Sequence, residues 1–295
     1  MKKKLALSIV CATHKGREKI PDLIESIYQN TYWPKEIIIC GTNRKDFDLI
    51  NIKKYKDLSI RKIISKIKSQ KYQRKKAQSY AKNNIILQLD DDLVLKNNFI
   101  ELMSRHFKYN KEKKVVCALI LIKTKKRQSM AQSYRWNYFF YTNFLFRLVL
   151  RLFNLGRKIK YYSILPSGRI CPLLPKNIFK NKKIISGIEW TPSSICYEKS
   201  AIKDAIINID LAEKKSYYED VIFSHSLYNK GYKLLIDANI VAYHPEFESF
   251  NIQEHLKTLK AQFFIVRHFK KSYALFLLDI LFATSYLLFK KVLRN

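Results

Sequence analysis

Residues 85–97 read Ile85-Ile-Leu-Gln-Leu-Asp90-Asp91-Asp92-Leu-Val-Leu-Lys-Asn97. An apolar run rich in β-branched residues leads directly into three carboxylates, which predicts a buried parallel strand with acidic groups at its carboxyl end, where open α/β sheets bind ligands. Side chains two apart on an extended backbone project to the same side, so we expect Asp90 and Asp92 to face together. Oxygen ligands suit a hard cation, Mg²⁺ or Mn²⁺. The alternative is a solvated acidic turn.

Length and composition set the outer limits. A chain of 295 residues can form one large α/β domain, or one domain with an appendage. Its hydrophobic content of 47% is enough for a core and excludes global disorder. The net charge of +32 indicates a polyanionic binding partner, which could be nucleic acid, an anionic membrane surface or phosphate-bearing substrates.

The cysteines and the amino terminus favour a cytoplasmic protein. The five cysteines are widely spaced and form no CxxC pair, which is typical of reduced thiols and supports neither a zinc site nor a disulfide framework. The first residues superficially resemble a signal peptide, but the apolar stretch is short and no small-residue cleavage site follows. We interpret Leu5–Ala12 as the first strand.

Strands and helices alternate along the first part of the chain. We expect strands at 5–12, 36–40, 85–90 and 113–123, and helices at 20–29 and 73–82, whereas 60–67 is ambiguous. This rhythm predicts a mostly parallel sheet flanked by helices.

Several ordered motifs resemble one known family. Thr13-His14 follows the first strand, Arg74 lies in a helix, and Leu89-Asp90-Asp91-Asp92 ends the central strand. Further on come Tyr218-Glu219-Asp220 in a helix that ends in Gly-Tyr, and Val241-Ala-Tyr-His244-Pro. In this order and at these separations, from about Leu5 to Glu246, the motifs resemble family 2 glycosyltransferases of the GT-A fold. The resemblance implies a Rossmann-like α/β domain.

The resemblance also implies roles for individual residues. Thr13, Arg74 and Asp90 match positions that contact the donor nucleotide, and Asp90, Asp92 and His244 match positions that bind the metal or the diphosphate. A bound cation would stabilise the charge that grows on the leaving group. The open alternatives are that Arg74 belongs to a solvated basic face and that His244 is an ordinary surface or core residue.

The acceptor side is implied in the same way. Asp220 matches the catalytic base of inverting members, which must take a proton from the acceptor hydroxyl. Glu219 and Trp190 are assigned to acceptor binding. The structural alternative for Glu219 and Asp220 is a helix amino terminus, where acidic side chains favour the macrodipole.

One departure from the family concerns the donor base. Many relatives carry an acidic pair after the second strand, whereas this chain has Cys40-Gly41-Thr42-Asn43. We expect Asn43 or Thr42 to take over the contact. A UDP-sugar is the expected donor.

Two segments have the residue pattern of helices that bind to a membrane surface. Residues 132–164 place polar side chains three or four apart within a broad aromatic and aliphatic surface, as an in-plane interfacial helix requires. This stripe comprises Asn143, Arg147, Arg151, Asn154 and Lys158. Tyr273–Phe289 is apolar but, at seventeen residues, shorter than the roughly 20 needed for a span, and Asp279 lies at its centre. We expect it to lie on the membrane or to pack against the first segment; a true span is the alternative.

Together these features predict a GT-A catalytic domain over residues 1–250 and amphipathic helices over 251–295. The predicted protein is an inverting, metal-dependent glycosyltransferase on the inner face of the plasma membrane. It would act on a lipid-linked or lipid-embedded acceptor such as lipopolysaccharide or capsule. The alternatives are a basic nucleic-acid-binding protein, given the charge and the interleaved aromatics, and a metal-dependent nucleotidyltransferase, which also uses paired carboxylates.

Overall fold

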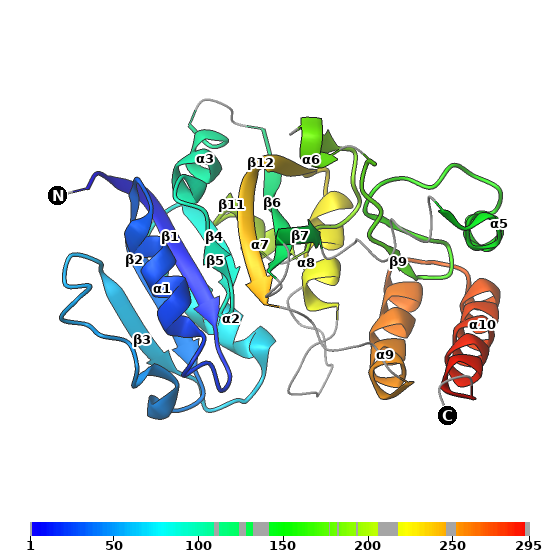
Figure 1. The fold of residues 1–295 in the computed structure, drawn as a ribbon, viewed down its shortest axis with the longest axis horizontal. Coiled ribbons are helices and arrows are strands. Elements are labelled where there is room, and N and C mark those ends of the chain that lie inside the picture. The colour runs from blue at the N-terminus through cyan, green and yellow to red at the C-terminus, as the bar shows by residue number, and fades with distance from the viewer. Residues whose placement is uncertain are drawn as a thin grey trace.

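A computed structural model describes residues 2–108, 112–123, 128–131, 142–176, 178–181, 183–192, 194–205, 218–245 and 252–292. The first half alternates strands and helices as predicted (Figure 1). Its elements are β1 (Lys4–Ala12), α1 (Ile20–Gln29), β2 (Trp33–Gly41), the short 3₁₀ helix η1 (Arg44–Phe47), β3 (Ile60–Ile64), α2 (Gln70–Tyr80), β4 (Ile85–Asp90), β5 (Val94–Leu95), α3 (Phe99–Arg105) and β6 (Lys114–Lys123). The ambiguous stretch at 60–67 is therefore a strand over its first five residues.

The second half adds several short strands, one strand of 13 residues, the helix that begins at Glu219, and two C-terminal helices. Its elements are β7 (Gln128–Ala131), α5 (Phe144–Phe153), β8 (Ser163–Ile164), β9 (Ile170–Cys171), α6 (Ile178–Asn181), β10 (Ile184–Ser186), β11 (Ile195–Glu198), α7 (Ala201–Asp204), α8 (Glu219–Tyr228), β12 (Lys233–Pro245), α9 (Ile252–His268) and α10 (Tyr273–Val292).

One mixed sheet organises the described residues. Its strand order is β10-β12-β6-β11-β4-β1-β2-β3, with β5 paired to β12 and β7 to β6. The pairs among β3, β2, β1 and β4 are parallel, whereas β11 runs antiparallel between β4 and β6. This arrangement confirms the predicted α/β class with a mostly parallel sheet at its amino-terminal side.

Apolar side chains on both faces of the sheet explain the two helical layers. Along β1, Ile9 faces one core cluster with α1 and α3, while its neighbour Val10 faces the other with α2 and α8. Helix α1 buries Ile20, Leu23, Ile24 and Ile27, the positions that its helical spacing predicts. The α9 residue Ile265 belongs to the second cluster, so α9 shares the main core.

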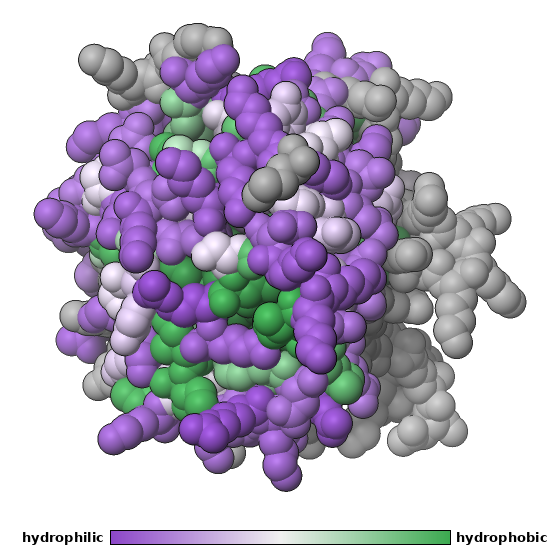
Figure 2. All heavy atoms as spheres, turned by 90° about the vertical axis from the view of Figure 1, so that its left-hand side faces the viewer, coloured by the Kyte–Doolittle hydropathy of each residue, from purple (hydrophilic) through white to green (hydrophobic). Residues whose placement is uncertain are grey.

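The two ends of the molecule differ in character. Figure 1 places β3 at one end and α5, α9 and α10 at the other. The face at the β3 end is mostly hydrophilic with a smaller apolar area (Figure 2). At the opposite end α5 and α10 contact each other through Phe153 and Phe282, whose ring centroids lie 6.1 Å apart.

Candidate active site

The carboxyl ends of β1, β2 and β4 meet at one edge of the sheet. Ala12 is the register partner of both Cys40 and Asp90, and the Thr13 amide donates to the Cys40 carbonyl at 2.9 Å. These parallel pairings bring residues from three distant parts of the chain together. The predicted site edge is thus formed by the backbone itself, before any side chain is considered.

Thr13 and Asp91 close the loop after β1. The Thr13 hydroxyl donates to Asp91 Oδ2 at 2.6 Å, so Thr13 is buried against the acidic turn. A Cβ on Gly16 would lie 1.9 Å from Thr13 Oγ1, which explains why the loop needs glycine there. Gln73, a residue that the sequence analysis did not single out, donates to the carbonyls of Thr13 and Cys40 and ties α2 to the same loop.

Asn43 serves local structure in this conformation. Its Oδ1 accepts from the Asp46 amide at 3.2 Å, and the Asp46 carboxylate in turn accepts from the Asn43 and Thr42 amides. This reciprocal capping box begins η1. Asp46 also accepts from the Lys15 amide at 3.2 Å, joining the loops after β1 and β2. Asn43 remains exposed beside the site, with its oxygen used as a cap.

The carboxylates of Asp90 and Asp92 have different partners, which corrects the expectation that they face together. Strand β4 ends at Asp90, and Asp91 and Asp92 form a turn, so the alternation of an extended strand no longer applies. Asp90 binds Arg74, whereas Asp92 contacts Lys19 and His244. The acidic run therefore supplies two separate clusters.

The first cluster joins α2, β4 and α8. Arg74 is buried and its guanidinium pairs with Asp90 and, at 3.4 Å, with Glu219 Oε1. Burial lowers the pKa of Arg74, but Glu219, Asp90 and Asp220 more than offset this, so the pKa of Arg74 is raised. The alternative of a solvated basic face is wrong for Arg74. The resemblance implied that Arg74 contacts the donor nucleotide. In this structure its buried guanidinium contacts the carboxylates of Asp90 and Glu219.

Glu219 and Asp220 occupy the first turn of α8 beside this guanidinium. Burial raises the pKa of Asp220 to about 6, although the charge of Arg74 opposes the shift. The pKa of Glu219 is also raised by burial against the same opposing charge, and Glu219 Oε2 is buried without a hydrogen-bond partner among the described residues. A carboxylate with a pKa near neutrality can both hold and release a proton in the working range.

The second cluster surrounds Asp92. His244 Nε2 lies 3.2 Å from Asp92 Oδ1, and Lys19 Nζ lies 3.1 Å from Asp92 Oδ2. Burial alone would raise the pKa of Asp92, but the interactions with His244 and Lys19 lower it to about 2. Lys19, at the amino end of α1, had no assigned role in the sequence analysis. Its position in a basic loop gave no sign that it would reach the carboxylate turn.

A divalent cation fits this second cluster in part. Asp92 Oδ1 is buried and lies 3.2 Å from His244 Nε2, so one hard oxygen and one imidazole nitrogen lie side by side. Across the described part of the chain, no three His, Cys, Asp or Glu side chains converge as a complete metal site. Mg²⁺ is commonly held by one or two protein groups together with substrate phosphates, and Asp92 with His244 matches that pattern.

Trp190 requires a correction, because the structure places it inside the core. Its side chain is 4% exposed, packs against the Tyr162 ring at 4.7 Å between centroids, and donates from Nε1 to the Ser163 carbonyl. In this position the indole cannot contact an acceptor. Large aromatic residues fill cores as readily as they bind sugars, and the sequence did not separate the two uses.

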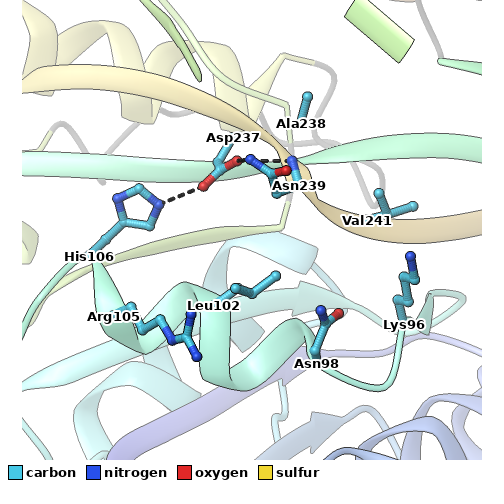
Figure 3. Close-up of a pocket in the computed structure, with 9 residues that line it drawn as sticks. All are labelled: Lys96, Asn98, Leu102, Arg105, His106, Asp237, Ala238, Asn239 and Val241. Carbon is cyan, nitrogen blue, oxygen red and sulfur yellow. Dashed lines mark hydrogen bonds and ion pairs between the residues drawn. The ribbon is translucent and has the colours of Figure 1, made fainter. Parts of the chain in front are cut away.

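A cleft of about 520 Å³ lies away from both clusters. It opens between α3 and the irregularity of β12 after Asp237, and its lining includes Lys96, Arg105 and the ion pair of His106 with Asp237 (Figure 3). None of the predicted site residues lines it. The cleft is therefore separate from the candidate active site.

The predicted interfacial segments form adjoining exposed helices. Residues 132–141 lie outside the described part, but α5 begins at Phe144 with Asn143 as its cap and ends at Phe153. Lys158 thus lies beyond the helix and outside the predicted stripe. The outer faces of α5 and α10 expose large apolar side chains, comprising Phe144, Leu145, Leu148, Leu152, Leu277, Leu278, Leu281 and Phe282. Within the described residues, no helix combines the length and apolarity that crossing a bilayer requires.

Comparison with known proteins places this geometry in context. The fold is similar to residues 1–349 of S. aureus TarS, with a TM-score of 0.52 and 13% identity over 89% of this chain and 65% of that chain. The same protein in complex with UDP-GlcNAc gives 0.52 and 14%, over 89% and 66%. GalNAc-T7 with UDP, GalNAc and Mn²⁺ gives 0.59 and 13%, over 89% and 48%. This chain therefore spans less than two-thirds of the length of these proteins.

Sequence comparison gives the family. No curated protein matches the chain. The profile described as "Glycosyl transferase family 2" matches residues 8–163, more than half of the chain, and includes Thr13, Arg74 and the acidic turn. This match confirms the family and the enzyme class predicted from the sequence, and it displaces the nucleotidyltransferase and nucleic-acid-binding alternatives. The chain belongs to glycosyl transferase family 2.

Proposed function

We propose that the protein transfers a sugar from a UDP-sugar, with inversion, to a hydroxyl of a lipid-linked or lipid-embedded glycan at the cytoplasmic face of a membrane. The observation that carries the proposal is the pair of unlike carboxylate clusters at one sheet edge. Asp92 is held ionised by Lys19 and His244, whereas burial raises the pKa of Asp220 to about 6. Environments that push carboxyl pKa values apart are typical of sites that divide binding from proton transfer.

The chemical step assigns Asp220 the role of base. Its ionised carboxylate takes the proton of the acceptor hydroxyl while that oxygen forms a bond to the anomeric carbon. The bond from the anomeric carbon to the diphosphate oxygen breaks on the opposite face, and the electron pair leaves with UDP. The products are the inverted glycoside, UDP and protonated Asp220, which returns its proton to solvent.

Arg74 and Glu219 support this base. Arg74 bridges Asp90 on β4 and Glu219 on α8, so it fixes the first turn of α8 relative to the sheet edge. The same guanidinium limits the rise in the pKa of Asp220. Glu219 remains the candidate for orienting the acceptor, because its second oxygen is buried without a hydrogen-bond partner among the described residues.

The donor lies, in this proposal, along the Thr13 and Asp92 side of the edge. When bound, Mg²⁺ or Mn²⁺ would neutralise charge on the diphosphate, with Asp92 and His244 as its protein ligands. Lys19 adds a further positive charge next to Asp92. UDP is favoured as the nucleotide because TarS and GalNAc-T7, which share the fold, are known in complexes with UDP-GlcNAc and with UDP.

The membrane part of the proposal rests on α5 and α10. Exposed apolar patches of this kind mark interaction surfaces, and the net charge of +32 favours an anionic lipid surface. Arg147 and Arg151 on α5 place cations beside the apolar side chains. A helix with this composition lies in the interface plane.

The function is tested by incubating the purified chain with a panel of UDP-sugars and Mn²⁺, and measuring UDP release with and without lipid-linked glycan acceptors. We expect release that depends on one sugar and increases with acceptor. Release that is equally fast in Asp220→Asn would contradict the proposed role of the base.

A further inference from the structure

Helix α10 carries a buried charge that its apolar sequence does not lead one to expect. Asp279 is 1% exposed, and its two oxygens accept from Arg169 Nε at 2.7 and 3.0 Å. Gln262 on α9 donates to the same carboxylate at 2.7 Å. A buried ion pair adds little net stability but can fix the register of packed elements. Asp279 therefore sets where α10 sits on α9 and on the turn that carries Arg169.

The turn before Arg169 is closely packed against both C-terminal helices. Gln262 also donates to the Ser167 carbonyl at 3.1 Å, and the Ser272 amide before α10 donates to the Pro166 carbonyl at 2.8 Å. Gly168 has a φ of +77°, and a Cβ there would lie 2.6 Å from Val266 Cγ2 on α9. The turn, α9 and α10 are thus held as one unit.

The same face of α9 reaches the active site. Thr258 lies one helical turn before Gln262, so both side chains occupy one stripe, and both are buried. Thr258 shares a side-chain hydrogen bond with Tyr218. Tyr218 is the residue immediately before Glu219 and Asp220, and its carbonyl accepts from the Ile222 amide at 2.9 Å in the first turn of α8.

The backbone conformation of Tyr218 depends on contacts such as the one with Thr258. Its φ of +60° and ψ of +20° place a bulky residue in the left-handed region, which is uncommon for any residue except glycine. Such conformations persist only where the surroundings hold them in place, and they gather at functional sites. Among the described residues, the Tyr218 side chain makes no capping hydrogen bond to α8. The contact with α9 is one restraint that holds Tyr218.

We propose that α9 and α10 position the candidate base, through a relay from Asp279 to Gln262 and Thr258 on α9 and then to Tyr218 at the start of α8. Asp279, Thr258 and Tyr218 are positioning residues in this relay, because none of them contacts the reacting atoms. The inference rests on the proposed function only in taking Asp220 as the base. It gives the C-terminal helices a second task besides surface attachment.

Amide hydrogen exchange in the full-length protein tests the relay without donor or acceptor. Tyr218→Phe and Thr258→Val each remove one hydroxyl with little change in shape, and Asp279→Asn removes the charge at the far end. In each variant we expect exchange at Ile222 to rise about fivefold, as the loss of one hydrogen bond predicts, while β1 and β4 keep their native exchange. Tyr55→Phe is the matched control, since it removes a hydroxyl that donates to Glu25 at 2.7 Å, in the amino-terminal half.

The outcomes separate the relay from loosening of the C-terminal helices alone and from the proposed function. A positioning role also predicts that the acidic limb of the pH profile of turnover shifts in Tyr218→Phe and Thr258→Val, which a smaller folded fraction would not produce. Unchanged exchange at Ile222 in Tyr218→Phe and Thr258→Val would overturn the relay, even if Asp279→Asn unfolds. Loosening confined to α9 and α10 in Asp279→Asn would overturn it as well. Asp220→Asn should keep native exchange at Ile222 yet fail in transfer, so failure of the base assignment and failure of the relay give different results.

Discussion

The two carboxylate clusters at the sheet edge have opposite electrostatic environments. Lys19 and His244 lower the pKa of Asp92 to about 2, whereas desolvation raises the pKa of Asp220 to about 6 beside a guanidinium already shared by Asp90 and Glu219. A permanently ionised group suits the binding of cations, and a group that titrates near neutrality suits proton transfer. The difference indicates that the two adjacent clusters have separate roles, one in binding cations and the other in proton transfer.

Removing the charge of Asp92 should have the largest effect. In Asp92→Asn we expect transfer to be abolished and donor affinity to fall, because a neutral amide no longer holds a cation. Turnover and UDP titration with Mn²⁺ check this, with Asp22→Asn on the exposed side of α1 as the control. Chelation should reproduce the loss, and Mg²⁺ or Mn²⁺ should restore activity. Full turnover in excess EDTA would show that transfer does not require a metal ion.

Removing the base should affect the rate but not donor binding. For Asp220→Asn we expect transfer to fall about 10²- to 10⁴-fold, the usual cost of losing a general base. UDP titration in the presence of Mn²⁺ should give the native affinity. Glu219→Gln is the neighbouring comparison and should be milder, because only one carboxylate can face the attacking hydroxyl. If Asp220→Asn also loses donor affinity, Asp220 takes part in donor binding and the two clusters do not have separate roles.

Of the two carboxylates, Asp220 should respond to acidic pH before Asp92 does. Asp220 accepts a proton only when ionised, so the transfer rate should fall about tenfold for each pH unit below its pKa of about 6. Asp92, with a pKa of about 2, keeps its charge over the same range. A pH profile of turnover at saturating donor measures the difference. A profile that stays flat down to pH 4 would show that Asp220 does not limit the rate.

Changes to the membrane surface should leave both clusters intact. Leu277→Ser combined with Leu281→Ser removes apolar side chains from the outer face of α10, and we expect binding to anionic vesicles to weaken at least about tenfold. UDP affinity should remain native, since neither residue contacts the site. Vesicle sedimentation at two salt concentrations measures the effect. Native vesicle binding in this variant would show that the outer face of α10 is not the attachment surface.

Local sequence patterns predicted most strands and helices of the first half, although residues 60–67 stayed ambiguous and α3 was not predicted. The β-branched runs gave β1 and β4, and the spacing of Ile20, Leu23, Ile24 and Ile27 gave α1 at its observed bounds. They were insufficient where a pattern has two explanations. Trp190 was assigned to the acceptor and lies in the core, and an extended geometry was assumed for Asp92 although β4 ends two residues earlier.

The sequence by itself determined the family, through the order and spacing of its motifs. It also determined the strand that carries the acidic run and the acidic start of α8, because each of these lies in contiguous residues. Only the tertiary structure decided the partners of each charge. Lys19 meets Asp92 across 73 positions, and Arg169 meets Asp279 across 110. Such pairs depend on which elements the sheet and its helices bring together. Whether a charge binds, titrates or locks two helices is therefore set by neighbours that are distant along the chain.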